Sequence, residues 1–308
     1  MNEKTIVFID KEKCSFFEAV KYSFKDCTIS SISDNITPPE IEKLATQINK
    51  DYSQVIFFDY VYNFNLLLPI ISKKLKRKWI VTSSLPAFFD QTAYNLFFQV
   101  MEYYERNLLD VVGVVDYDVY LTFKEKYNLK YLKLDIDLKN NSEKEDVIGI
   151  IGYDYLNSDN FFNQLSAVTL TDYKRVLVLN EMNVTKQFAK QFDLIIEKEE
   201  SVYKLMDRSK INLSVGLFSI CYPYFLYSMD NGTICLLGNT HLLDDNKYLK
   251  DNLVLNSDDS IDEISFKINN VLKNKSDIFK EYKSFRKQYS IDSKKSIEEF
   301  LEEKENKN

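Results

Sequence analysis

The sequence predicts an α/β protein with two facing Rossmann-like, doubly wound domains, the first covering residues 1–140 and the second 141–290. Short apolar runs alternate with longer amphipathic segments along the whole chain. The alternation stops at a polar stretch, LKNNSEKED at 138–146, and then begins again. Hydrophobic residues make up 45% of the 308 residues, which is enough to build a substantial core.

In the first half, apolar runs predict buried strands and the segments between them predict helices. The clearest helix start is Thr37-Pro38-Pro39-Glu40, where Thr37 is the expected N-cap and Glu40 completes a capping box. The predicted strands cover 5–9, 28–32, 54–58, 79–82, 111–115 and 131–136. The predicted helices cover 15–24, 37–50, 63–76, 87–109 and 117–127.

The second half repeats the pattern. A second capping box, Ser260 with Glu263, opens an amphipathic helix. The predicted strands cover 147–151, 175–179, 193–196, 211–218, 233–237 and 253–255. The predicted helices cover 158–166, 183–191, 202–208, 222–230, 260–274, 277–288 and 292–303.

Charge and composition exclude several classes of protein. The net charge of −7 argues against a nucleic acid as binding partner. The one basic run, 73–78, ends a predicted helix, so we interpret it as a solvated helix end; contact with a membrane surface or a partner protein is the alternative. Only 6 glycines occur, and no Gly-rich phosphate loop is present.

The few zinc-ligand residues argue against a zinc site. The four cysteines are widely spaced, and His241 is the only histidine. No apolar segment approaches the roughly 20 residues that span a bilayer. The chain starts directly with an apolar run, so we expect a cytoplasmic protein.

The stretch 208–239 predicts a strand, a short helix, a turn at Gly232 and a second strand. Such a crossover joins parallel strands, and ligands of parallel sheets bind at the carboxyl ends of the strands. Ser209-Lys210-Ile211-Asn212-Leu213 followed by Gly232 resembles the donor-sugar segment of GT-B glycosyltransferases, in the group that includes spore-maturation-type proteins. The resemblance is specific over about 205–290, and it implies a C-terminal helix, 291–308, that crosses back to the first domain.

The family carries an Arg-x-Phe-Glu helix in this segment, whose glutamate holds hydroxyls of the donor. Counted back from Gly232, the Glu position falls on Tyr227 and the Arg position on Tyr224. These tyrosines either contact the donor or pack in the core. The resemblance also implies that the loop after the first strand of the second domain approaches the phosphates. The expected donor-binding residues are therefore Gly152, Tyr153, Asp154, Tyr224, Tyr227, Asn231 and Gly232.

The acceptor side needs a general base if the reaction inverts the sugar. Asp90, which follows the loop 83–86, is the first candidate, and Asp10 and Asp59 at predicted strand ends are further candidates. Each of them alone is also a common helix cap or surface acid. Two Asp-x-Asp triplets, 116–118 and 135–137, would hold a metal in the other glycosyltransferase fold, GT-A.

The resemblance implies transfer of a sugar, with hexosyl transfer as the expected type. The expected donor is a nucleotide sugar, most simply a UDP-sugar, with an unknown acceptor, no metal and no cofactor. A catalytically silent GT-B-like protein that binds a glycan, a polypeptide or a partner subunit is the alternative. A metal-dependent GT-A enzyme is the third reading, and the spacing of the triplets is its only support.

Overall fold

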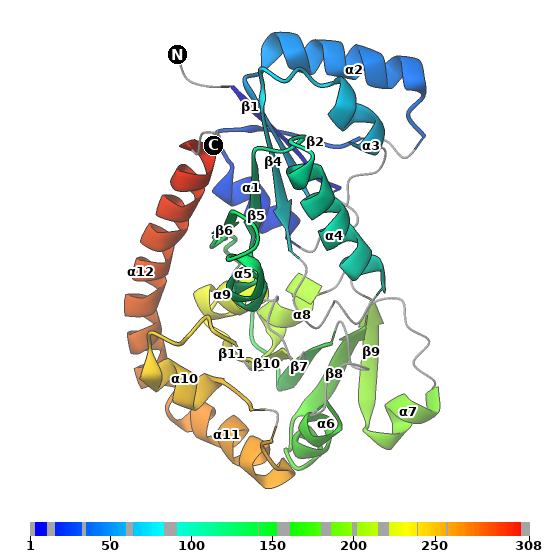
Figure 1. The fold of residues 1–308 in the computed structure, drawn as a ribbon. Helices are drawn as coiled ribbons and strands as arrows, with labels where there is room; N and C mark the ends of the chain where they lie inside the picture. The colour runs from blue at the N-terminus through cyan, green and yellow to red at the C-terminus, as the bar shows by residue number, and fades with distance from the viewer. Residues whose placement is uncertain are drawn as a thin grey trace. The chain divides into compact units, whose positions relative to one another are not determined.

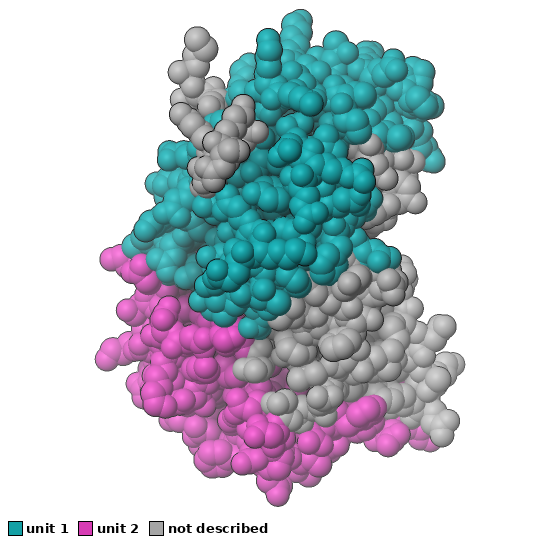
Figure 2. Space-filling model, in the orientation of Figure 1, with its two compact units in different colours: residues 1–136, 289–308 teal, residues 137–288 magenta. Residues whose placement is uncertain are grey.

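The chain folds into two compact units, each built on a parallel sheet (Figures 1 and 2). Unit 1 contains residues 1–136 and 289–308, and unit 2 contains residues 137–288. The computed structural model describes residues 4–10, 16–32, 35–59, 64–82, 91–140, 142–152, 161–179, 186–198, 202–214, 222–238, 240–256 and 258–302.

Unit 1 contains a six-stranded sheet in the order β2-β1-β3-β4-β5-β6, and every neighbouring pair is parallel. This confirms the predicted α/β class. The strands are β1 (Thr5–Phe8), β2 (Thr28–Ser30), β3 (Gln54–Phe58), β4 (Lys76–Val81), β5 (Val111–Val114) and β6 (Leu129–Tyr131).

Helices connect these strands as parallel crossovers require. They are α1 (Phe17–Ser23), α2 (Pro38–Asp51), α3 (Phe64–Leu67) with the short 3₁₀ helix Leu68–Ile70, α4 (Gln91–Glu105) and α5 (Tyr117–Phe123). Thr37 and Glu40 form the predicted capping box of α2. One core packs helices α2 to α5 against alternate strand residues such as Phe8, Phe57 and Trp79.

The opposite face of the same sheet receives α12 (Lys275–Glu302), whose residues from 289 onward belong to unit 1. A Cβ at Gly113 would lie 3.1 Å from the Phe300 ring, so the helix packs closely on this face. The buried ammonium of Lys78 donates hydrogen bonds to the carbonyls of Phe300 and Leu301. These are carbonyls of the last helical turn, which have no partner within the helix, so Lys78 caps the C-terminus of α12.

Unit 2 contains a five-stranded parallel sheet in the order β11-β10-β7-β8-β9. The strands are β7 (Val147–Gly152), β8 (Lys174–Leu179), β9 (Leu194–Lys198), β10 (Ile211–Ser214) and β11 (Ile234–Leu236). The helices are α6 (Phe161–Thr169), α7 (Lys186–Gln191), α8 (Val202–Arg208), α9 (Tyr222–Asp230), α10 (Lys247–Leu253) and α11 (Ile261–Lys273). The first half of α12 also belongs to unit 2.

Several predicted elements are wrong in detail. The predicted helix 63–76 ends at residue 70, and the basic run continues into strand β4 instead. Arg77 and Lys78 are buried in β4, while Lys73 and Lys74 before the strand are exposed, so the run is not a helix end and only its first part is solvated. A strand that begins with charged residues lacks the apolar pattern by which buried strands are recognised. The partners that stabilise these charges lie far away in the sequence, so the sequence alone does not indicate burial.

Three further predicted elements differ from the observed ones. Strand β6 covers only 129–131; the N–H of Leu132 still donates to Val114 of β5, and residues 133–136 continue beyond it outside the strand. The predicted strand 253–255 is the end of α10, followed by a single bridge between Leu237 and Val254. The two predicted last helices are one continuous helix, because Ser290 and Ile291 do not interrupt the pattern. In the described part of the chain, every helix is too short or too polar to cross a membrane.

Candidate functional site

Helix α9 carries Tyr224 and Tyr227, the two tyrosines that the sequence resemblance assigns to the Arg and Glu positions. Every residue from Tyr222 to Met229 is buried. Tyr224 is 5% exposed and Tyr227 is 4% exposed. The ring of Tyr203 on α8 packs against both, with centroid distances of 5.6 Å and 4.7 Å respectively. This burial favours the core-packing interpretation of the two side chains.

The hydroxyl of Tyr227 has a specific partner in the structure. It donates a hydrogen bond of 2.7 Å to Oδ1 of Asp207 at the end of α8. The second oxygen of this buried carboxylate accepts a hydrogen bond from Nδ2 of Asn140. The ammonium of Lys144 donates to the Asp207 carbonyl oxygen and to Oγ1 of Thr233. The polar end of Tyr227 therefore belongs to a partly buried network within unit 2, with Asp207 and Thr233 buried and Asn140 exposed.

This network lies on the amino-terminal side of the sheet of unit 2. Asp207 belongs to the last turn of α8, which leads into the start of β10, and Asn140 and Lys144 come shortly before β7. In a parallel sheet, all strands begin at the same edge. The phenol of Tyr227 thus points away from the edge where ligands of such sheets bind.

The environment also fixes the protonation state of the phenol. Burial raises the pKa of Tyr227 above its usual value, and the hydrogen bond to the Asp207 carboxylate raises this pKa further. Tyr227 therefore remains a neutral hydrogen-bond donor throughout the ordinary pH range.

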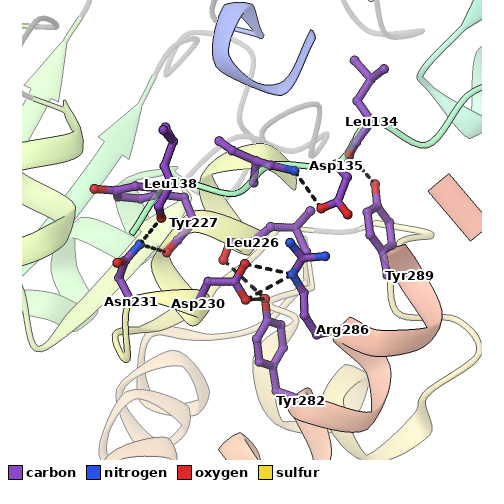
Figure 3. A network of polar contacts seen from close by, with 11 residues as sticks. Leu134, Asp135, Leu138, Leu226, Tyr227, Asp230, Asn231, Tyr282, Arg286 and Tyr289 are labelled. Carbon is purple, nitrogen blue, oxygen red and sulfur yellow. Dashed lines mark hydrogen bonds and ion pairs between the residues drawn. The ribbon is translucent and has the colours of Figure 1, made fainter. Parts of the chain in front are cut away.

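Asn231 ties the end of α9 to the segment at the start of unit 2 (Figure 3). Nδ2 of Asn231 donates to the carbonyls of Leu138 and Tyr227, at 2.9 Å and 2.8 Å. Oδ1 of Asn231 accepts from the backbone N–H of Asn140. Gly232 has a φ of 76°, which a residue with a side chain rarely adopts. The predicted turn at Gly232 is confirmed, and Asn231 has a structural role beside it.

The last residue of α9 is bound to the first half of α12. Oδ1 of Asp230 accepts a 2.8 Å hydrogen bond from the Tyr282 hydroxyl, and Nε of Arg286 contacts both oxygens of Asp230 (Figure 3). The ion-pair side chains are 17% and 18% exposed. Together with the Asp207 network, these contacts hold the C-terminal half of α9 in place.

The segment 209–213, which carries the resemblance to GT-B glycosyltransferases, also has a structural role. Asn212 is completely buried in β10, and its Nδ2 donates to Oγ of Ser228 at 2.7 Å. Oδ1 of Asn212 and Oγ of Ser209 lie 2.3 Å and 2.8 Å from the position of a Cβ at Gly149 in the neighbouring strand β7. A side chain at position 149 would displace the Asn212 and Ser209 side chains, so Gly149 and the Ser-x-x-Asn pattern fit together in the packing of β7 beside β10.

The predicted phosphate-side residues lie at the carboxyl ends of the strands of unit 2. Gly152 is the last residue of β7, where it pairs with Leu179 of β8. Tyr153 and Asp154 lie outside the described residues, as do the loop 215–221 that precedes α9 and the general-base candidate Asp90. The donor role of these residues stays a prediction.

Asp10 and Asp59 do lie at the carboxyl ends of adjacent strands, β1 and β3. The two Asp59 oxygens accept hydrogen bonds from the backbone N–H and the hydroxyl of Thr82, at 2.7 Å and 2.5 Å. Asp59 also has a positive φ of 49°. These hydrogen bonds join the ends of β3 and β4, so Asp59 has a structural role. Its role as a general base stays a prediction. Asp10 is partly exposed.

The described Asp-x-Asp triplets have other roles. Asp116 is the N-cap of α5 and accepts from the backbone N–H of Val119 at 2.8 Å. Asp135 is buried, and its carboxylate accepts from the N–H of Ile136. Among the described residues, no group of three or more His, Cys, Asp or Glu side chains is arranged to hold a metal ion.

Solved structures similar to this chain were found, although no protein-family model matches and the search of curated proteins gave no match. Anabaena HepE in complex with UDP and glucose is 10% identical, with a TM-score of 0.65, over 97% of this chain and 99% of that one. A glycosyltransferase from Rickettsia africae is 11% identical, with a TM-score of 0.57, over 98% of each chain. TarM is 12% identical, with a TM-score of 0.57, over 83% of this chain, which spans about half (54%) of TarM.

These similarities define the class of fold. The chain has the GT-B fold, with two Rossmann-like units that each contain a parallel sheet. The match over nearly the full length of HepE and of the Rickettsia protein includes both units. The sequence prediction of the fold class is therefore confirmed.

Sequence reasoning missed the polar network around Asp207. Its members, Asn140, Lys144, Asp207 and Tyr227, are far apart in sequence and separated by ordinary elements. A polar residue on the buried side of a short helix is the one signal that was available, since buried carboxylates need partners. Asp207, the only acid in α8, fits this description.

We expect Tyr227→Phe to lower the free energy of unfolding by about 1.5–3 kcal/mol, because it removes a buried hydrogen bond to a charged acceptor. Nucleotide-sugar affinity should stay unchanged, because the phenol points to the amino-terminal side of the sheet. Urea denaturation and isothermal titration of both proteins measure the two effects. A variant with wild-type stability and weaker nucleotide-sugar binding would contradict this structural role and support the donor contact. Tyr248→Phe, at an exposed tyrosine on α10, is the matched control.

Proposed function

We propose that this protein is a glycosyltransferase that transfers a sugar, of the hexosyl type, from a nucleotide-sugar donor to an acceptor in the cytoplasm. The donor is a UDP-sugar, and the reaction needs no metal ion. The observation that carries the proposal is the GT-B fold along the full chain, matched at a TM-score of 0.65 to HepE in complex with UDP and glucose. A related HepE structure contains UDP-glucose, with a TM-score of 0.62.

The proposed donor site uses the carboxyl ends of the strands in unit 2, beginning at Gly152. Main-chain N–H groups at this edge can bind phosphates without a metal ion. The family's carboxylate is replaced by Tyr227, which is engaged with Asp207. A neutral or absent contact to the ribose makes donor binding weaker, since charge-assisted hydrogen bonds are about twice as strong as neutral ones.

The same replacement favours a second candidate function. If the chain has lost sugar transfer, it is a silent GT-B protein that binds a glycan, a polypeptide or a partner transferase. Two observations favour this candidate. The hydroxyl of Tyr227 is hydrogen-bonded to Asp207, and Tyr224 is buried.

Thermal-shift and titration experiments distinguish the active transferase from the silent protein. The ligands are UDP, UDP-glucose, UDP-galactose and UDP-N-acetylglucosamine, each tested in EDTA and in Mn²⁺. A ligand at 100 times its dissociation constant stabilises the folded chain by about 2.7 kcal/mol. We expect a shift in EDTA, together with slow release of UDP when donor and water alone are present. An increase in melting temperature without release of UDP, even when a panel of acceptors is added, would support the silent protein.

The variant Gly152→Asp tests the position of the site. A carboxylate at the end of β7 repels the diphosphate, so we expect the nucleotide-dependent shift to disappear. Thr169→Asp, at an exposed position in the same unit, adds the same charge and should keep the shift. An unchanged shift in Gly152→Asp, or a strict need for Mn²⁺, would contradict the proposed donor site.

A further inference from the structure

Unit 1 contains a cavity along the open edge of its sheet. Its volume is about 510 Å³, within the roughly 300–1,000 Å³ that ligand pockets occupy. It is lined by the turn after α5, by the edge strand β6 and by the last part of α12, with Tyr120, Asn128, Tyr131, Glu299 and Phe300 among the lining residues. All of these residues belong to unit 1.

The backbone of β6 explains why this edge is open. The N–H of Leu132 donates to Val114 of β5, so strand alternation directs the peptide groups of Tyr131 and Lys133 to the opposite side. At Lys133, α12 covers this side: the N–H of Lys133 donates to Oγ of Ser296, and its carbonyl accepts from Ser293. Tyr131, two residues earlier on this edge strand, lines the cavity.

The polar side chains of the cavity are balanced between donors and acceptors. Lys124, Lys130 and Asn128 supply N–H donors, and Glu125 and Glu299 supply carboxylate acceptors. The two lysines and two glutamates give no net formal charge. A ligand that both donates and accepts hydrogen bonds, and that carries no charge, matches this lining better than an anion such as a nucleotide.

Aromatic rings form one wall of the cavity. The rings of Tyr120 and Tyr131 lie 6.0 Å apart, and the Lys124 ammonium is 5.5 Å from the centroid of Tyr120. Tyr117 packs against both tyrosines. Aromatic rings beside hydrogen-bonding groups suit a ligand with an apolar face and a polar rim.

We propose that this cavity binds a neutral saccharide, with Tyr120 and Tyr131 beside the sugar ring and with Glu125, Asn128 and Glu299 bonded to its hydroxyls. A sugar hydroxyl both donates and accepts, and a pyranose ring has apolar C–H faces, so one ligand class satisfies both kinds of lining. The site belongs to unit 1 alone and is separate from the proposed donor site. Saccharide binding at this cavity is therefore tested independently of nucleotide binding.

Saturation-transfer NMR of the intact protein with maltose, cellobiose, lactose, chitobiose and sucrose tests the proposal. We expect transfer to at least one disaccharide, and this transfer should persist in the presence of saturating UDP. In Glu299→Ala and Asn128→Ala, affinity should fall about tenfold, equal to ~1.4 kcal/mol. Tyr120→Ala should reduce it as well.

Glu298→Ala is the matched control, because Glu298 is the neighbouring residue on α12 and lines a different cavity. It should leave binding unchanged. No transfer to any of the five sugars, transfer abolished by UDP, or equal affinity in Glu298→Ala and Glu299→Ala would each overturn the proposal. Both glutamates are exposed, so loss of the fold does not confuse the comparison.

Discussion

Replacement of Asp207 by alanine is expected to lower the free energy of unfolding by about 3 kcal/mol, because it removes a buried hydrogen bond to a charged acceptor and leaves the Tyr227 hydroxyl without that acceptor. The carboxylate is 3% exposed. It accepts hydrogen bonds from the Tyr227 hydroxyl and from Nδ2 of Asn140. Without it, the buried Tyr227 hydroxyl loses its acceptor, which costs about 1–3 kcal/mol, whereas Asn140 is exposed and can turn to water.

Urea denaturation measures this loss, and hydrogen exchange locates it. Exchange should accelerate in α8 and α9 and stay slow in unit 1. Asp207→Asn keeps an acceptor oxygen for the Tyr227 hydroxyl, so it should lose less stability than Asp207→Ala. Asp251→Ala, at an exposed acid in the same unit, is the control and should stay within about 0.5 kcal/mol of wild type. Equal stability of Asp207→Ala and Asp251→Ala would refute the role of the network.

Replacement of Lys78 by alanine should cost about 3–5 kcal/mol in unit 1. The side chain is completely buried, and its truncation leaves a cavity beside Phe300. It also leaves the last carbonyls of α12 without their ammonium donor. We expect faster proteolysis and faster hydrogen exchange in residues 289–302.

Lys78→Met separates the two causes, because methionine keeps most of the volume and lacks the charge. It should retain the packing and still expose the end of α12 to exchange. Lys74→Ala, at an exposed lysine of the same basic run, should have no effect. If exchange at residues 289–302 is the same in Lys78→Met and wild type, packing alone holds the helix.

Much of the fold could be predicted, because parallel strands and their crossover helices leave local signals. The apolar runs at β1, β3, β7 and β8 and the capping boxes at Thr37 and Ser260 all correspond to observed elements. Strand β4 was misplaced at its start, since Lys76, Arg77 and Lys78 look like a surface segment until their long-range partners are known.

The site was less predictable than the fold. The predicted helix 222–230, which contains Tyr224 and Tyr227, is confirmed as α9, but the sequence could not show where the phenol of Tyr227 points. That direction depends on Asp207 and Asn140, which lie 20 and 87 residues before Tyr227. The cavity beside β6 was also invisible, because it depends on where α12 stops covering the sheet edge.

The burial of α9 has a consequence for any attempt to rebuild the family's motif by engineering. Tyr227→Glu would bring a second carboxylate toward Asp207 in a site that water does not reach, and two such groups cannot both ionise at low cost. The single change is therefore unfavourable, while the pair Tyr227→Glu with Asp207→Asn removes the repulsion. A carboxylate at position 227 therefore requires changes at both positions, and no single substitution introduces it without this electrostatic cost.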